Sequence, residues 1–145
     1  MSVTRIRTYI SRFKFPIIIV LVLFAYECSY IYTLPPLARE LYFHKTFHGG
    51  LLIDATKVIG PHFQPGQPKA ETFAYLERQG FKIYPVNTDQ RQYGDIYKNT
   101  YTAVFPLRSS FWRIILTSYR ADVYLQFDNK DQLVRSYGDV TMLHL

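Results

Sequence analysis

Residues 121–138, ADVYLQFDNKDQLVRSYG, contain two strand-like runs on either side of a short polar turn. In the first run apolar and polar residues alternate, so the apolar ones fall on one face of an extended chain. The turn, residues 128–131, consists of the residue types that reverse chain direction. The stretch predicts an antiparallel hairpin with one buried face; Val123, Leu125 and Phe127 lie on that face, and Asp122, Tyr124 and Gln126 on the other.

Two further strand-like runs precede this hairpin, and a third completes its second strand. They are Tyr101–Leu107, Trp112–Arg120 and Leu133–Leu143, each rich in β-branched and aromatic residues. Pro106 cannot donate a backbone hydrogen bond, so its strand is expected at a sheet edge. Together these runs predict an antiparallel β-meander.

Tyrosines decorate these strands and the polar segment before them. Tyr101, Tyr119, Tyr124 and Tyr137 would form either a binding surface or ordinary cross-strand packing. Residues 87–99, NTDQRQYGDIYKN, are polar and predict a long loop. Its candidate recognition residues are Asp89, Arg91, Tyr93, Asp95 and Tyr97; the alternative is a loop without a binding role.

The segment 65–81, PGQPKAETFAYLERQGF, predicts a short amphipathic helix that begins near Pro68 and ends before Gly80. Before it, residues 51–59 (LLIDATKVI) predict a first strand. Strand, helix and meander together predict an α+β domain in which one or two short helices pack on an antiparallel sheet.

Residues 15–36, FPIIIVLVLFAYECSYIYTLPP, form the most apolar stretch of the chain. As a helix, Pro16–Thr33 would be about 27 Å long at 1.5 Å per residue, enough to cross a bilayer. Three tyrosines near its outer end suit the headgroup region, and two prolines follow. We therefore predict an N-terminal transmembrane anchor.

Two other interpretations of this stretch are weaker. Lipid attachment at Cys28 would need a small residue immediately before it, and Glu27 stands there. Cleavage as a secretion signal would need small residues before the cut, and no A-x-A sequence occurs. Glu27 would either reach the membrane interface or contact a partner helix in the membrane.

The net charge is +6, and Arg5, Arg7, Arg12 and Lys14 supply +4 of it without any acid among them, which leaves +2 for the remainder. A positive flank stays in the cytoplasm, so we expect a single-pass inner (plasma) membrane protein with its C-terminal domain in the periplasm or outside. No nucleic-acid partner is expected. The expected organisation is a basic cytoplasmic segment (1–15), an anchor (16–33), a stalk (34–50) and an exported α+β domain (51–145).

Candidate chemistry is sparse. A single cysteine excludes an internal disulfide. His44 and His48 have the i, i+4 spacing of metal ligands on a helix, but no third ligand is identifiable nearby, and no metal site is predicted. The chain lacks nucleophile-elbow, P-loop and H-E-x-x-H patterns. We expect no enzyme activity, no catalytic residue and no cofactor.

The segment GQPKAETFAYLERQGF, followed by a meander that ends in VYLQFDNKDQLVRSYG, resembles small bacterial envelope proteins of the outer-membrane assembly lipoprotein type (the SmpA/OmlA group). The likeness covers about residues 66–138. It implies an α+β fold and a protein-binding role at the cell envelope.

The expected function is a membrane-anchored, non-catalytic protein-interaction module of the bacterial envelope, acting as an accessory or assembly subunit. Its partners would be the bilayer and another envelope or membrane protein. Two alternatives remain open at this point: an immunity or inhibitor protein that neutralises an exported enzyme or toxin, and a small-ligand or lipid-binding domain.

Overall fold

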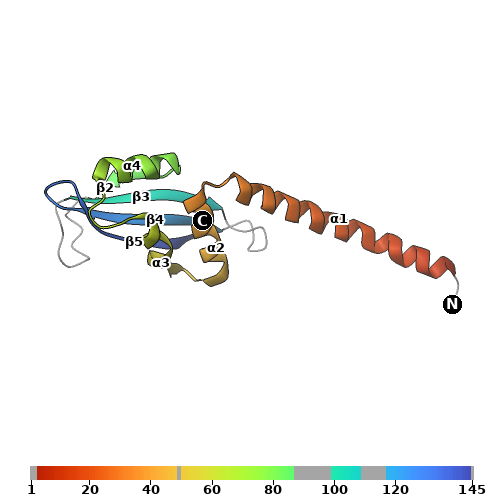
Figure 1. Cartoon of the computed structure of the whole chain (residues 1–145). Coiled ribbons are helices and arrows are strands. Elements are labelled where there is room, and N and C mark those ends of the chain that lie inside the picture. The colour runs from red at the N-terminus through yellow and green to blue at the C-terminus, as the bar shows by residue number, and fades with distance from the viewer. Residues whose placement is uncertain (1–2, 49, 87–98, 109–116, 145) are drawn as a thin grey trace. The chain divides into compact units, whose positions relative to one another are not determined.

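A computed structural model describes residues 3–48, 50–86, 99–108 and 117–144 (Figure 1). Within these, the side chains of residues 3–15, Phe47, Arg108, Thr117 and His144 are outside the description. The chain divides into two compact units, residues 1–34 and residues 35–145. Each unit is described by itself.

The first unit is one helix, α1 (Val3–Thr33). It continues through Pro16, and its segment Pro16–Thr33 has a mean hydropathy of 1.7 with none of it buried. Among the described residues, α1 alone is long and apolar enough to cross a membrane. The helix ends at Thr33, whose hydroxyl donates to the Tyr30 carbonyl at 2.7 Å.

The second unit is built on a five-stranded antiparallel sheet, as the sequence predicts for an α+β domain. The strands lie in the order β1-β5-β4-β3-β2, so β2 to β5 form a meander and β1 adds to the outer edge of β5. Their bounds are β1 Leu52–Asp54, β2 Lys82–Pro85, β3 Asn99–Arg108, β4 Thr117–Phe127 and β5 Leu133–His144.

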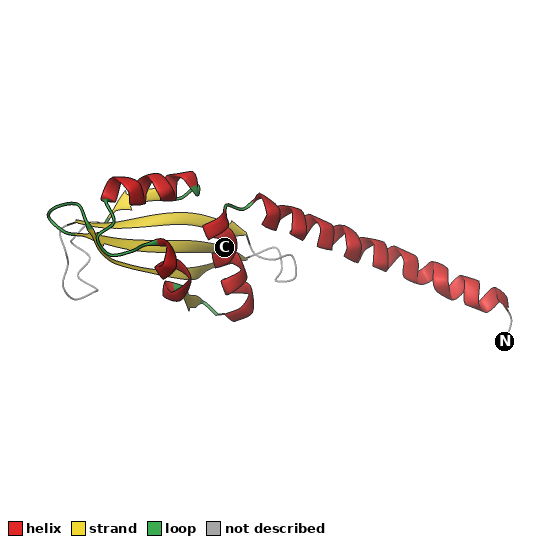
Figure 2. Cartoon of the chain, in the orientation of Figure 1, coloured by secondary structure: helices red, strands yellow, loops and turns green. Residues whose placement is uncertain are grey.

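One face of this sheet is covered by short helices (Figure 2). They are α2 (Pro36–His48), α3 (Thr56–Ile59), the 3-10 turn η1 (Gly60–His62) and α4 (Lys69–Arg78). Contacts to the same face place α2, α3 and α4: Lys45 of α2 lies over Tyr119, Ile59 of α3 meets Gly138, and Phe73 of α4 packs on Phe127. The core lies between this face and the helices.

Helix α2 belongs to the folded unit, whereas the sequence analysis assigned residues 34–50 to a stalk. Leu37, Ala38, Leu41 and Tyr42 are all buried. Lys45 is buried as well, with its ammonium 4.2 Å from the Tyr42 ring centroid and 4.3 Å from that of Tyr119. These residues therefore belong to the core of the folded unit.

Three predicted strands differ from those observed. The strand expected over residues 51–59 is only Leu52–Asp54, because the Asp54 carboxylate accepts the Thr56 backbone N–H at 2.8 Å and α3 begins there. The strands expected over Trp112–Arg120 and 121–127 are one strand, since β4 runs unbroken from Thr117 to Phe127; residues 112–116 lie outside the described part. The strand 101–107 is β3 and the final strand is β5, both slightly longer than predicted.

Pro106 does not mark an edge strand, because β3 lies between β4 and β2. The expectation that a proline lies where no neighbouring strand needs its backbone donor nevertheless holds at Pro106. Strand β2 pairs with Tyr101–Val104 only, so Pro106 lies beyond its end and pairs with Arg120 of β4 alone. A missing backbone donor therefore costs no sheet hydrogen bond on the β2 side.

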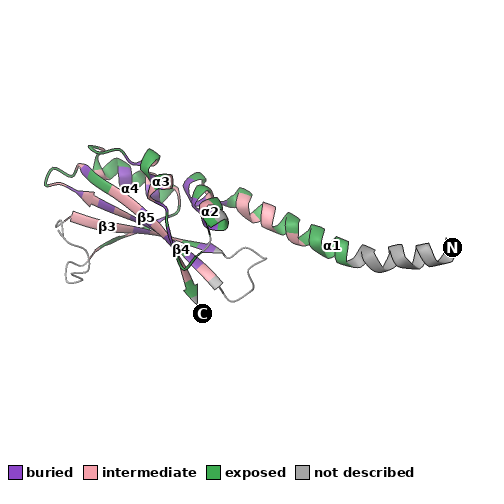
Figure 3. Cartoon of the chain, turned by 90° about the horizontal axis from the view of Figure 1, so that it is seen from below, coloured by how far each residue is buried: buried purple, intermediate pink, exposed green. Residues whose placement is uncertain are grey.

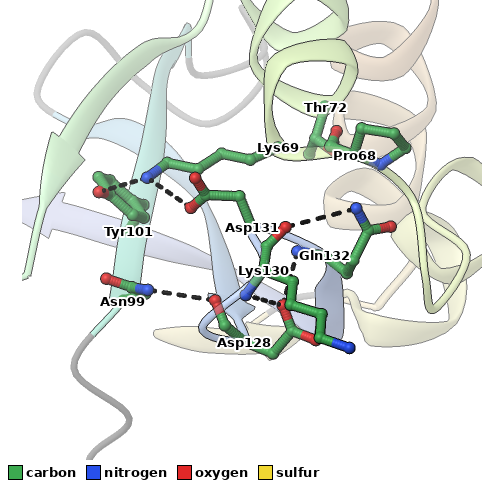
Figure 4. Close-up of polar contacts among 9 residues, drawn as sticks. All are labelled: Pro68, Lys69, Thr72, Asn99, Tyr101, Asp128, Lys130, Asp131 and Gln132. Carbon is green, nitrogen blue, oxygen red and sulfur yellow. Dashed lines mark hydrogen bonds and ion pairs between the residues drawn. The ribbon is translucent and has the colours of Figure 1, made fainter.

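The predicted turn between β4 and β5 is fastened to the first residue of α4 (Figure 4). The Lys69 ammonium donates to the Tyr101 hydroxyl at 2.9 Å and to the Asp131 carboxylate at 3.2 Å. These bonds raise the pKa of Lys69, the Tyr101 bond most strongly. Inside the turn, the Asp128 carboxylate accepts two backbone N–H groups, from Lys130 and Gln132.

Candidate functional site

The sheet face opposite the helices, here called the open face, carries polar and aromatic side chains in rows. Among the described residues of the second unit, no helix packs on it, and buried residues alternate with partly exposed ones along its strands (Figure 3). Strand register places one row across Tyr84, Thr102, Tyr124 and Tyr137. The next row runs through Lys82, Val104, Asp122, Asp139 and Asp54. A third contains Pro106, Arg120, Thr141 and Leu52.

Two carboxylates lie directly opposite one another in the second row. Asp122 is only 2% exposed and accepts a hydrogen bond from Arg120 Nε at 2.8 Å. Asp139, its cross-strand partner, accepts one from the Thr141 hydroxyl at 3.1 Å. Burial, followed by the negative charge of Asp122, raises the pKa of Asp139. Opposed like charges destabilise a sheet, so Arg120 and Thr141 offset part of that cost.

The neighbouring row contains a pair of stacked tyrosines. The rings of Tyr124 and Tyr137 are 4.7 Å apart and nearly parallel, at 12°. Burial, with the charge of Asp139 next, raises the pKa of Tyr124 well above that of a free phenol. The Arg135 guanidinium lies 5.9 Å from the Tyr137 ring centroid. Tyr124 thus keeps its proton at neutral pH and remains a hydrogen-bond donor.

The four tyrosines considered as one surface in the sequence analysis separate onto the two sheet faces. Tyr124 and Tyr137 lie on the open face. Tyr119 is buried under Lys45 of α2, and Tyr101 packs edge-on against Phe73 of α4. Only two of the four therefore belong to the open face.

A second constellation joins three elements on the helical side. The Glu40 carboxylate lies 2.8 Å from His62 Nε2, and the Tyr75 hydroxyl lies 3.0 Å from His62 Nδ1. A neutral ring with its proton on Nε2 satisfies both: it donates to Glu40 and accepts from Tyr75. Burial, and then the charge of Glu40, raises the pKa of Tyr75, which disfavours a phenolate nucleophile. The chain of bonds thus ties α2, η1 and α4 together.

The other residues singled out from the sequence fall in three places. Glu27 and Cys28 are partly exposed residues of α1. Asp89, Arg91, Tyr93, Asp95 and Tyr97 lie outside the described residues. The His44 and His48 ring centroids are 4.1 Å apart with the rings tilted by 35°, and one nitrogen of each ring contacts a backbone carbonyl: His44 Nε2 that of Asp54 and His48 Nδ1 that of His44. The described residues contain no group of three potential metal ligands.

The sequence analysis did not identify the residues of these two groups, because strand register and tertiary packing bring them together. Asp122 and Asp139 are distant in sequence and carry no motif, and Glu40, His62 and Tyr75 come from three separate elements. The alternation along residues 121–127 did place Asp122 and Tyr124 on one face. One signal in the sequence could have indicated the pair: Asp122 stands in the middle of a strand, and charged residues rarely occupy such positions without a partner.

Comparisons with protein families, curated proteins and solved structures find no match to this chain.

Proposed function

We propose that this protein is a membrane-anchored, non-catalytic protein-interaction module of the bacterial cell envelope, and that the open face of its sheet binds the partner. One observation carries the proposal: one sheet face packs against every described helix of the domain, while the other holds ordered tyrosine, arginine and aspartate side chains. The role is that of an accessory or assembly subunit.

The chemistry of the open face suits a protein partner. Tyrosine and arginine are enriched in the energetically important parts of protein interfaces. The Tyr124–Tyr137 stack and the Arg120–Asp122 pair hold these side chains in place before binding, which reduces the entropy lost on association. The sheet rather than a loop thereby provides the recognition surface.

The proposed location is supported by α1 and its flank. We propose that Pro16–Thr33 spans the inner (plasma) membrane once, with the basic residues 5–14 in the cytoplasm and the domain in the periplasm or outside the cell. Glu27 then lies near the outer end of the span, where a partner's membrane helix would meet it. The anchor confines the search for a partner to the membrane surface.

Site-specific photo-crosslinking in living cells tests the open face. A benzoylphenylalanine replaces Gln126, which lies on the open face, in the full-length chain; a matched variant carries it at Ala74, an exposed residue of α4. We expect a discrete crosslinked protein from position 126 and none of that mass from position 74. Adducts from 74 alone, or no adduct from 126, would contradict the proposal.

The identity of the captured protein separates the roles. A membrane or envelope assembly component supports the accessory-subunit role. An exported hydrolase or toxin whose activity the purified full-length protein blocks would instead establish the inhibitor role through the same face. In either case, Tyr124→Ala with Tyr137→Ala is expected to abolish the adduct without loss of membrane localisation.

A further inference from the structure

The carboxylates of the open face outnumber the cations that contact them. Asp122, Asp139 and Asp54 lie side by side across β4, β5 and β1. Arg120 Nε bonds the Asp122 carboxylate at 2.8 Å, and this is the one ion pair of the row among the described residues. Lys82 belongs to the same row but lies on β2, with β3 between it and β4.

Asp139 is the partly buried carboxylate of this row that no cation contacts. Its side chain accepts a hydrogen bond from the Thr141 hydroxyl at 3.1 Å. Burial first, and the charge of Asp122 second, raise its pKa; the Thr141 bond and Arg120 lower it by less. The charged and titratable groups around it are Arg120, Asp122 and Tyr124 of β4, Asp54 of β1, and Tyr137 of β5.

A protein bound on the open face would remove the water that still reaches Asp139. The Tyr124–Tyr137 stack lies in the adjoining row, about 7 Å away along the strands, so a partner that covers the stack covers Asp139 as well. Loss of water disfavours the charged form of a carboxyl group. The buried centres of protein interfaces are also poor in charged residues, so a cation from the partner is not the ordinary case.

We propose that the partner binds the open face with Asp139 in its neutral, protonated form, and that binding therefore tightens as the pH falls. The inference rests on the proposed function and specifies its partner: the surface opposite Asp139 presents no lysine or arginine. Complex formation takes up one proton from the solvent. Its affinity then rises as the pH falls from the pKa of Asp139 in the complex to the pKa in the free protein.

Photo-crosslinking in permeabilised membranes tests this inference, because the buffer then sets the pH on both sides. The membranes come from cells that express the full-length chain with benzoylphenylalanine at Gln126, on the open face. They are irradiated at about pH 5 and about pH 7.5, and the readout is the ratio of the yields of the adduct. Both values lie above 3.8, the ordinary pKa of an aspartate, so exposed aspartates stay ionised in both buffers.

We expect a several-fold higher adduct yield at the lower pH. Asp139→Asn is neutral in both buffers and should give a high yield in both. Thr141→Val removes the hydroxyl that favours the ionised carboxylate, so it should move the response to higher pH. The matched control is Glu71→Gln, which removes an exposed carboxylate of α4 on the other side of the sheet and should keep the response unchanged.

Two results would overturn the proposal while the open-face partner remains. A higher yield at pH 7.5 means that the partner supplies a cation to ionised Asp139. A pH response that survives in Asp139→Asn, shown to be folded by circular dichroism, means that another group binds the proton. Absence of any adduct at either pH removes the partner itself, and this inference with it.

Discussion

At Gly138, strand β5 has no room for a methyl group. A Cβ there would lie 2.9 Å from the backbone oxygen of Asp122 and 2.9 Å from Ile59 Cδ1. The backbone oxygen belongs to the sheet and cannot move independently. We expect Gly138→Ala to lower the free energy of unfolding by about 1–3 kcal/mol, the usual cost of overpacking.

Gly60→Ala is the matched control for this prediction. Nothing lies within 4 Å of the added Cβ, and the backbone at Gly60 is right-handed helical. Urea unfolding of both variants, followed by circular dichroism, gives the comparison. Equal stability of the two variants would show that α3 does not pack on β5 as described.

Removing the charge of Asp139 is expected to stabilise the domain, by an amount that depends on pH. Its pKa is raised from the ordinary value of 3.8 by burial and then by Asp122, so the folded state binds this proton more tightly than the unfolded state does. The associated stabilisation is complete below about pH 3.8 and is lost as the pH rises through the raised pKa. We therefore expect Asp139→Asn to be more stable than the wild type at pH 7, with the gain disappearing at acidic pH.

Asp54 should show the opposite trend. Hydrogen bonds from Thr56, its hydroxyl first and its backbone N–H second, hold the pKa of Asp54 below the ordinary value. Its stabilisation is present at neutral pH and is lost as the pH falls through the lowered pKa. Relative to the wild type, the urea midpoints of Asp139→Asn and Asp54→Asn should thus change in opposite directions between pH 7 and about pH 2, which lies below the unfolded value of 3.8; parallel changes would contradict the assignment.

Single residues were predictable from the sequence only as members of a pattern. The alternation in 121–127 correctly separates Asp122 and Tyr124 from Val123 and Leu125. That Asp122 faces Asp139 depends on the register of β4 against β5, and a shift of one residue would put each side chain on the other face. The alternation therefore predicted the sheet face on which each side chain lies, whereas the cross-strand partner of Asp122 is known only from the structure.

Among the elements, α2 is the one whose role changes most between sequence and structure. Leu41 is 1% exposed in α2, so truncating it leaves a cavity beneath the helix. We expect Leu41→Ala to destabilise the domain by about 2–4 kcal/mol. Phe43→Ala, an exposed position of the same helix, should change stability little. Thermal unfolding of the full-length chain in detergent measures both; a neutral Leu41→Ala would restore the stalk interpretation.

The remaining elements show where local sequence is sufficient. Helix α4 was predicted almost to the residue, because Pro68 precedes it and Gly80, with φ of +77°, terminates it. The strand at residues 51–59 was predicted too long, because the hydrogen bond from the Thr56 backbone N–H to the Asp54 carboxylate turns the chain and outweighs β propensity. That turn is as local as the ends of α4, but it was missed because the residues around it also favour a strand.

For the whole molecule, composition and order of elements predicted an α+β domain behind an apolar helix, and the structure has both. They did not predict that β1 would pair with β5, because strands distant in sequence leave no local signal of their partnership. They also did not predict that α2 would belong to the domain core. The candidate site depends on that same long-range pairing, since its carboxylate row runs from β4 across β5 to β1.

The position of β5 has a consequence for how the protein folds during its synthesis. It is the last strand in chain order, yet it lies between β1 and β4 and pairs with both. During synthesis, β1 and the strands β2 to β4 therefore remain as unfinished pieces, each with an unpaired edge, until the final strand arrives. A chain interrupted before residue 133 would present these open edges and would be a substrate for chaperones and proteases.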